Sequence, residues 1–327
     1  MKRLRVLIWH IHGSYLNSLA RVDHDWYLPV KPGKPEGYGG RGPTFDLPDN
    51  VYEIPAEQVR DFSYDVVVLQ TPRNLHEDLP ALLGPRQHEP ALLYLEHNTP
   101  RPDAVNTRHP FADHDGLLVH VTAFNRLMWD NGDLATRVIG HSVALDPAIT
   151  YDGSLDKGII VTNGMQGRPR ITGLDIFERA RVQVPLDVVG MKTEELGGLG
   201  DVPYRDLHRL TARYRFLFSP MRYTSLPLAV VEAMTIGMPV VALGTTALPD
   251  VIEHGVNGYI AQDPDLLIPH MQRLIADPGL ARSLGARARE TARLRFGMER
   301  FQAGWDAALH DAIALKHGSA LLVGTSA

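Results

Sequence analysis

Two series of short apolar runs, separated by helix-length segments, set the strongest constraint on the fold of this chain. The first series consists of "RVLIWHI" (5–11), "WYLPV" (26–30), "DVVVLQ" (65–70), "ALLYLEH" (91–97), "GLLVHVT" (116–122) and "TRVIG" (136–140). The second consists of "GIIVTNG" (158–164), "LDVVG" (186–190), "RFLFSP" (215–220), "PVVALG" (239–244) and "GYIA" (258–261). Runs of this length, alternating with helical stretches, are typical of buried parallel strands in βαβ units. The sequence therefore predicts an α/β protein with two doubly wound, Rossmann-like domains.

The length of the chain also favours two domains. Its 327 residues exceed the size at which a single hydrophobic core stops growing, roughly 250 to 300 residues. The turn-rich stretch 141–158 precedes the second series and marks the join. We predict an N-terminal domain over 1–150, a C-terminal domain over 151–300, and a helical segment over 301–327 that packs back on the first domain. The Gly/Pro-rich stretch 31–50 is predicted to be a long loop, either functional or mobile.

Composition excludes several classes of protein. The net charge is −5 and no basic cluster is interleaved with aromatic residues, which argues against a nucleic-acid partner. The absence of cysteine excludes disulfides and thiolate metal sites. No apolar run reaches the roughly 18 residues of a bilayer span, and the N-terminal stretch has no cleavage site. We therefore expect a cytoplasmic protein without a transmembrane segment. The arginine-rich stretch 281–300 fits either a solvated face or peripheral membrane contact.

Glycines and polar residues follow several of the predicted strands. Ligands of open α/β sheets bind beyond the carboxyl ends of the strands, so the cleft between two such domains is the expected site. After the first strand, Gly13 can let the backbone approach an anion, and Ser14 can begin a helix. His97 and Asn98 follow the strand "ALLYLE". The segment "GMQGRPRITG" (164–173), with three glycines and two arginines, follows the first strand of the second series.

The stretch "SLPLAVVEAMTIGMPVVALG" (225–244) combines a helix and a strand with one unexpected carboxylate. A serine or threonine can cap the helix, Pro227 fits its first turn, and Gly237 ends it. The helix has little polar face, so it should be buried on most sides. Glu232 nevertheless lies in its middle. A buried carboxylate needs hydrogen-bond partners, and the sequence pattern alone does not name them.

These motifs resemble the donor-binding domain of the family 4 retaining glycosyltransferases, which have the GT-B fold. The similarity lies in "LDVVG", in "LGDVPYRDLHRLTARYRFLFSPMRY" (199–223) and in "LPLAVVEAMTIGMPVVALGTTALPDVIEHGVNGYIA" (226–261). It is close over about residues 158–300. Over the first half only the strand pattern, "HGS" and "EH" agree. The resemblance implies two Rossmann-like domains facing across a cleft, and transfer of a sugar from a nucleoside-diphosphate-sugar to an acceptor hydroxyl with retention.

The resemblance further implies roles for residues of the second half. Glu232 would accept hydrogen bonds from ribose hydroxyls, so that it is buried but satisfied once the donor binds. Backbone N–H groups near Leu228 and Ala229 would hold phosphate oxygens. Arg168 or Arg170 would neutralise the leaving diphosphate in place of a metal. The other donor-binding candidates are Gly13, Ser14, Gly164, Gly190, Val202, Thr224 and Thr245.

The first half supplies candidates on the acceptor side. His97 follows a strand where the family has a histidine near the reacting sugar, so it joins the two arginines as a catalytic candidate. His12 and Asn98 are the acceptor candidates. No cofactor or metal is expected, because the "DHD" triplets at 23–25 and 113–115 fit solvated loops. We expect a UDP-sugar rather than a GDP-sugar as donor, and a saccharide or glycolipid as acceptor.

One residue departs from the family pattern. Thr224 lies eight positions before Glu232, where the family usually has a glutamate that touches the donor sugar. Threonine has a shorter reach and no charge, so either the sugar is held differently or catalysis is reduced. Two alternatives to a transferase therefore stay open. One is a noncatalytic nucleotide-sugar-binding relative, and the other is a GT-B enzyme of different chemistry, such as an epimerase or a phosphorylase.

Overall fold

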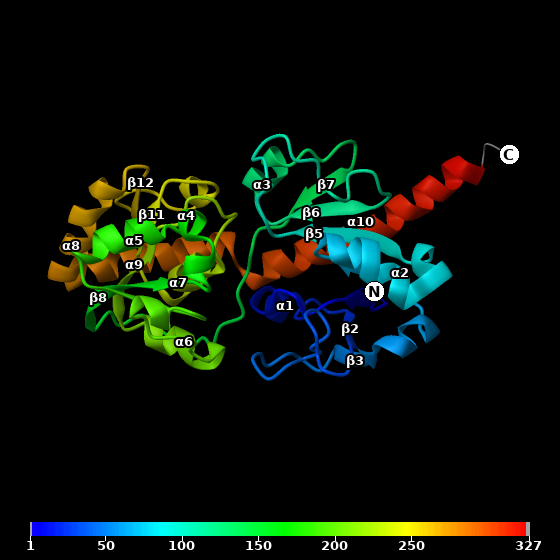
Figure 1. Cartoon of the computed structure of the whole chain (residues 1–327), viewed down its shortest axis with the longest axis horizontal. Helices are drawn as coiled ribbons and strands as arrows, with labels where there is room; N and C mark the ends of the chain where they lie inside the picture. The colour runs from blue at the N-terminus through cyan, green and yellow to red at the C-terminus, as the bar shows by residue number, and fades with distance from the viewer. Residues whose placement is uncertain (1, 325–327) are drawn as a thin grey trace. The chain divides into compact units, whose positions relative to one another are not determined.

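The structure, a computed structural model, describes residues 2–324 and divides the chain into two compact units. Unit 1 consists of the chain up to Ser142 together with the segment from Met298 onward, and unit 2 spans Val143–Gly297. Each unit is built on its own sheet with helices packed against it (Figure 1). The prediction of two doubly wound α/β domains is confirmed.

Unit 1 contains a seven-stranded parallel sheet in the order β3-β2-β1-β4-β5-β6-β7. The order reverses between β1 and β4, which is the topological switch point where open α/β sheets bind ligands. All four residues of β4, "VVVL", are buried, as expected for a strand covered on both faces. The strands are β1 Arg5–Ile8, β2 Asp25–Val30, β3 Val51–Pro55, β4 Val66–Leu69, β5 Ala91–Glu96, β6 Leu117–His120 and β7 Ala135–Val138.

Strand β3 has no counterpart among the predicted runs. Only Val51 and Ile54 of "VYEIP" are buried, while Tyr52 and Glu53 are exposed. The strand pairs on one side only, with β2, so it lies at the edge of the sheet. An edge strand with two inward side chains has no continuous apolar run, which is why the sequence pattern misses it.

The helices of unit 1 include one that comes from the far end of the chain. This helix, α10, contacts β4, β5, β6 and α1. It buries Phe301 and Trp305, and the Trp305 Nε1 group donates a hydrogen bond to the Tyr15 hydroxyl at 3.0 Å. The unit's helices are α1 Gly13–Leu19, α2 Leu79–Leu83, α3 Ala123–Met128 and α10 Met298–Gly324, with short turns of helix at Ala56–Asp61, Asn74–Asp78 and Gly84–His88.

Unit 2 contains a five-stranded parallel sheet in the order β12-β11-β10-β8-β9. Its switch point lies between β8 and β10. The strands are β8 Leu155–Val161, β9 Leu186–Val189, β10 Tyr214–Ser219, β11 Val240–Leu243 and β12 Gly258–Ala261. The helices are α4 Pro169–Thr172, α5 Leu174–Arg181, α6 Tyr204–Thr211, α7 Leu228–Ile236, α8 Ile268–Ala276 and α9 Pro278–Arg295, with single turns at Met165–Gly167, Glu194–Leu196, Leu248–Asp250 and Pro264–Leu267.

Helix α7 begins later than the sequence pattern predicts. The expected start near Ser225 is wrong, because the helix begins at Leu228 with Pro227 as its N-cap. Proline disfavours helical geometry in the residue before it, so Leu226 stays outside the helix, which begins only after Pro227. The predicted end is confirmed. Gly237 terminates the helix in the left-handed conformation, with φ of 90°.

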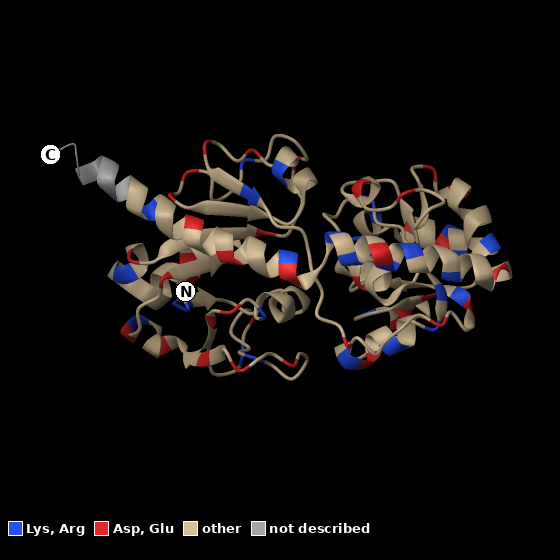
Figure 2. Cartoon of the chain, turned by 180° about the vertical axis from the view of Figure 1, so that it is seen from behind, with Lys and Arg blue, Asp and Glu red and all other residues tan. Residues whose placement is uncertain are grey.

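Among the described residues, every helix is too short or too polar for a bilayer span. Lys and Arg recur along the outer helices of unit 2 (Figure 2). Helix α9 alone carries five arginines, all exposed, while Ala281, Leu284, Gly285, Ala288 and Ala292 are buried. This is the arginine-rich helix expected from the sequence.

Candidate functional site

The loops that follow β8, β10 and β11 are tied together at the carboxyl edge of the unit 2 sheet. The Arg222 backbone N–H donates to the Ile171 carbonyl at 2.8 Å. The Thr245 hydroxyl donates to the Met221 carbonyl at 3.0 Å, and the Thr246 hydroxyl donates to the Ser225 carbonyl at 2.9 Å. The three loops therefore form one connected surface at the switch point of the sheet.

The arginines of this surface differ in whether a carboxylate already neutralises their charge. Arg222 binds Asp175 through two hydrogen bonds of 2.6 Å, which hold the pKa of Asp175 below its usual range. Arg170 approaches the same carboxylate at 3.3 Å. Arg168 is exposed and has no carboxylate partner among the residues that the structure describes. Of the two predicted arginines, Arg168 thus carries the positive charge that is not already neutralised.

The start of α7 lies directly after this surface. Leu228 and Ala229 are the first two residues of the helix and are half-buried. The first N–H groups of a helix have no partner within the helix, and the helix dipole adds positive potential there. This end of α7 can therefore bind an anion. Thr224 is half-buried in the preceding loop, with its hydroxyl 3.9 Å from the sulfur of Met221.

Glu232 is buried, as predicted, with 6% of its surface exposed. Its partners in the free protein come from α6. The Tyr204 hydroxyl donates to Glu232 Oε1 at 3.0 Å, and His208 Nε2 lies 3.4 Å from Glu232 Oε2. The hydrogen bonds from ribose hydroxyls stay a prediction. The protein itself already partners the carboxylate.

Three further donor candidates lie in loops of unit 2. Gly164 takes the left-handed conformation, with φ of 57°, at the turn that follows β8. Gly190 has φ of 133°, and a Cβ there would collide with the Thr162 carbonyl, so the glycine allows close packing of two strand ends. Val202 is half-buried just before α6.

In unit 1, His97 lies at the centre of an aromatic cluster at the carboxyl ends of β1 and β5. Its ring centroid lies 4.1 Å from that of His12 and 4.7 Å from that of Tyr15, and Tyr15 also contacts His141 at 5.7 Å. Burial, together with the neighbouring imidazoles, holds the pKa of His97 well below its usual value. His97 is therefore neutral at physiological pH.

A hydrogen-bond chain assigns the tautomer of His97. The Gln70 side-chain amide donates to the Trp9 carbonyl at 2.8 Å, which turns Gln70 Oε1 toward His97 Nε2 at 3.3 Å. The proton of the neutral ring thus lies on Nε2, and Nδ1 is a hydrogen-bond acceptor. Such a group suits a ligand hydroxyl better than a charged ligand.

The other unit 1 candidates have structural partners. The missing Cβ of Gly13 leaves room for the ring of Phe45, which belongs to the long loop 31–50. Ser14 is half-buried in the first turn of α1. Asn98 is exposed, but its backbone N–H donates to Glu96 at 2.6 Å and its carbonyl accepts from Trp129 at 2.9 Å. Burial lowers the pKa of His12, so this acceptor candidate is also a neutral group.

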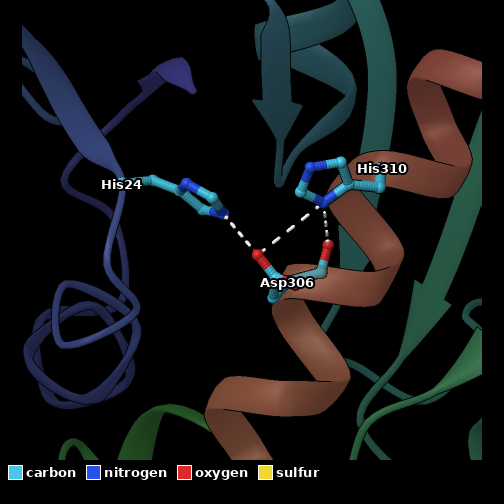
Figure 3. Close-up of side chains that lie close together, drawn as sticks. All are labelled: His24, Asp306 and His310. Carbon is cyan, nitrogen blue, oxygen red and sulfur yellow. Dashed lines mark hydrogen bonds and ion pairs between the residues drawn. The ribbon is translucent and has the colours of Figure 1, made fainter. Parts of the chain in front are cut away.

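One group of side chains in unit 1 has ligand types suited to a metal. His24, Asp306 and His310 place one ligand atom each within 4.8 Å of one another (Figure 3). His24 Nε2 lies 3.1 Å from Asp306 Oδ1, but the Leu4 N–H donates to His24 Nδ1 at 3.2 Å. That bond leaves the ring proton on Nε2, facing Asp306 instead of offering a lone pair to an ion. The group is best described as a contact that fastens α10 to the start of β2.

The comparison with known families gives a match within unit 2. Residues 193–291 match the family described as "Glycosyl transferases group 1". The match includes Thr224, the start of α7, Glu232 and Thr245, and it leaves Arg168, Arg170 and all of unit 1 outside.

A curated protein is similar to part of the chain. N-acetyl-alpha-D-glucosaminyl L-malate synthase from Bacillus anthracis is 30% identical over 91 residues, which are 27% of this chain. The aligned part spans only 24% of the length of that synthase.

Solved structures resemble the chain over both units. Anabaena HepE, solved in complex with UDP and glucose, has a TM-score of 0.69 at 17% identity and covers 94% of this chain and 100% of its own. A glycosyltransferase from Rickettsia africae has a TM-score of 0.69 at 11% identity and covers 96% and 99%. The chain has the GT-B fold, as predicted.

Sequence reasoning missed Arg222, Tyr204, His208 and Gln70. Tyr204 and His208 are spaced i, i+4 on an amphipathic helix, which places both on one face, but nothing in the spacing says that this face meets Glu232. Arg222 finds Asp175 across 47 residues of sequence. These contacts depend on tertiary packing. Of the four residues, only Tyr204 and His208 show a pattern in the sequence, which is their i, i+4 spacing.

Proposed function

We propose that the chain is a glycosyltransferase that moves a sugar from a nucleoside-diphosphate-sugar, with UDP favoured over GDP, to a hydroxyl of a saccharide or glycolipid acceptor. The transfer proceeds with retention and without a metal, and it serves the synthesis of a polysaccharide or glycoconjugate in the cytoplasm. The observation that carries the proposal is the buried Glu232, a carboxylate on an otherwise apolar helix whose N-terminus suits a phosphate. Both features lie inside the matched family segment.

Unit 2 provides groups suited to each part of the donor. Glu232 accepts hydrogen bonds from the ribose hydroxyls, and the first N–H groups of α7 bind the diphosphate. Arg168 adds the positive charge that offsets the charge developing on the leaving diphosphate. The family match, which contains Glu232 and the start of α7, and the UDP complex of HepE support nucleotide binding by these two features.

Unit 1 provides the acceptor side. The neutral His12 and His97 offer hydrogen-bonding groups without charge, as a sugar or other hydroxyl ligand requires. His97 is the group that contacts the reacting sugar. In this mechanism the leaving phosphate assists the incoming hydroxyl, and the protein positions the reactants and stabilises charge.

The experiment that tests the proposal is a calorimetric titration with UDP and GDP, followed by an assay of UDP-sugar hydrolysis and transfer. Glu232→Ala should weaken UDP binding by roughly 2 to 3 kcal/mol, the scale of hydrogen bonds to a charged group. Glu178→Ala, which changes an exposed glutamate on α5 of the same unit, is the matched control and should leave affinity unchanged. Turnover should survive EDTA. Equal UDP affinity in Glu232→Ala and the wild type would remove the basis of the proposal.

A noncatalytic nucleotide-sugar binder is the second candidate, and Thr224 is the observation that favours it. The threonine offers one hydroxyl where a carboxylate would grip the sugar, so UDP and the intact donor should bind within about 1 kcal/mol of each other. The hydrolysis assay separates the two functions. A protein that binds the donor but turns over none of the UDP-sugars and GDP-sugars supplied would be a binder.

A further inference from the structure

Helix α7 itself offers Glu232 almost no polar side chains as hydrogen-bond partners. Its sequence "LAVVEAMTI" is apolar on almost every side, and six of its nine residues are buried, Glu232 among them. A carboxylate in such surroundings is costly unless it is hydrogen-bonded. The contacts that meet this need come from a different helix, α6.

Tyr204 and His208 both lie against the Glu232 carboxylate and also contact each other. They stand one helical turn apart on α6, and their rings pack edge to face with centroids 4.7 Å apart and planes at 85°. His208 is 4% exposed, so its ring has little freedom to turn away. The Tyr204 hydroxyl donates to Oε1, and His208 Nε2 approaches Oε2, so the two residues address different oxygens of Glu232.

This arrangement fixes the rotation of the carboxylate. The Tyr204 hydroxyl holds Oε1 by a hydrogen bond, and the buried His208 ring, 3.4 Å from Oε2, limits the rotation of the other oxygen. An ionised carboxylate accepts about four hydrogen bonds, so these contacts orient the group without exhausting it. Adjacent hydroxyls of a ribose can both be bound by one carboxylate only when its plane is held at the correct angle. A freely rotating carboxylate would gain less from the second hydroxyl, because binding would first have to restrict its rotation.

We propose that Tyr204 and His208 are positioning residues that hold the Glu232 carboxylate and thereby set how strongly the site distinguishes ribose from 2′-deoxyribose. The inference rests on the proposed function, in which Glu232 binds the ribose of the nucleotide. It goes further by assigning the selectivity for the sugar of the nucleotide to a pair of α6 residues that need not touch the ligand.

The first experiment compares calorimetric titrations of UDP and 2′-deoxy-UDP on the full chain. The wild type should bind UDP about tenfold or more tightly than 2′-deoxy-UDP, the value of one hydrogen bond to a charged group. Tyr204→Phe should weaken UDP about fivefold and 2′-deoxy-UDP less than twofold, so that the ratio falls. Tyr259→Phe, which removes a hydroxyl from a buried tyrosine of β12 in the same unit, is the control and should keep the ratio.

His208 is tested by comparing two substitutions. His208→Gln keeps a polar side chain of similar length beside Oε2, and it should keep most of the UDP selectivity. His208→Ala removes the ring that lies beside Oε2, so the carboxylate can rotate more freely, and the selectivity should fall about threefold. A purely structural role would lower stability and weaken both nucleotides equally, leaving the ratio unchanged, and that result would contradict the proposal.

A double-mutant cycle shows whether Tyr204 acts through Glu232. In a Glu232→Ala background, Tyr204→Phe should change UDP affinity less than twofold. A full fivefold loss in that background would overturn the inference, because Tyr204 would then act on the ligand directly. If the wild type binds neither UDP nor GDP, the proposed function fails and the inference fails with it. If Glu232→Ala abolishes ribose selectivity while Tyr204→Phe and His208→Ala preserve it, the inference alone fails.

Discussion

Units 1 and 2 share one architectural plan, a parallel sheet covered by helices, yet they use titratable side chains in opposite ways. Ten of the 15 histidines precede Ser142 and two follow Met298, whereas unit 2 has three. Burial lowers the pKa of the imidazoles at the candidate site of unit 1, which makes them neutral. The candidate site of unit 2 instead has a buried carboxylate, an exposed arginine and a helix N-terminus.

The difference shows that each unit suits a different part of the proposed chemistry. Neutral hydrogen-bonding groups match an uncharged ligand rich in hydroxyls, and they cost little to bury when partnered. Fixed charges and dipoles match a diphosphate. The same sheet topology therefore supports two kinds of site, because the loops and helix starts after the strands differ.

The largest expected effect separates turnover from nucleotide binding. His97→Ala should lower the rate of transfer about a hundredfold, the low end for a residue that contacts the reacting groups, because the protein loses a neutral hydrogen-bonding group. UDP affinity should change less than twofold, since His97 belongs to unit 1. Steady-state rates and calorimetric titration measure the two quantities. His88→Ala, at an exposed histidine of the same unit, is the control. If His97→Ala also weakened UDP binding, the assignment of nucleotide binding to unit 2 alone would be contradicted.

The next effect concerns pH and the buried histidines of unit 1. Burial lowers the pKa of His120 from 6.5 to about 4, and it lowers those of His12, His24 and His97. Below pH 6.5 the unfolded chain takes up protons that the folded unit does not, so stability is lost as pH falls from 6.5 toward the folded pKa values. His120 alone should cost about 2 kcal/mol between pH 7 and 5.

The measurement uses the distribution of tryptophans. All four, Trp9, Trp26, Trp129 and Trp305, lie in unit 1, so tryptophan fluorescence follows the unfolding of that unit. Denaturant titrations at pH 7 and 5 give the free energy of unfolding at each pH. His120→Asn should reduce the pH dependence by removing one titrating group. A fluorescence midpoint that does not move between these pH values would contradict the assignment of buried neutral imidazoles.

The smallest effect distinguishes two neighbouring arginines of unit 2. Arg168→Ala should weaken UDP by about 1 kcal/mol, the upper end for an exposed ion pair, while uridine binding stays unchanged. Arg170→Ala should have less than half of this effect, because Asp175 already offsets part of its charge. Titrations at low and high salt measure both, and the Arg168 effect should shrink with salt. An equal loss of UDP affinity in the two variants would mean that the Asp175 contact does not determine which arginine binds the phosphate.

The fold was largely predictable because each buried parallel strand is a continuous apolar run in the sequence. A strand covered on both faces, such as "VVVL", must be apolar at every position, and this can be read without knowing its neighbours. The edge strand β3 has no continuous apolar run, since only two of its side chains point inward. The start of α7 was misplaced because the effect of Pro227 on the residue before it outweighs a possible serine cap.

The candidate site was predictable only in part. Glu232 stood out because a carboxylate contradicts an apolar helix, and the helix start followed from its position after a strand. Its partners on α6 could not be predicted, because a period of 3.6 shows which residues share a face but not what the face meets. The choice between Arg168 and Arg170 likewise depends on Asp175 and Arg222, which the fold brings together from separate segments.

The path of the chain has a consequence for the order of events during synthesis. Unit 1 is discontinuous, because α10 is made only after the whole of unit 2 has been made. Until then the sheet surface that contacts α10, and the pocket around Tyr15 that receives Trp305, remain uncovered. We expect unit 2, the middle of the sequence, to become protease-resistant on the ribosome before unit 1, the beginning. Nascent chains stalled with Gly297 outside the exit tunnel should contain a protected unit 2 and a cleavable unit 1, and protection of both would show that the strands of unit 1 hold together without their last helix.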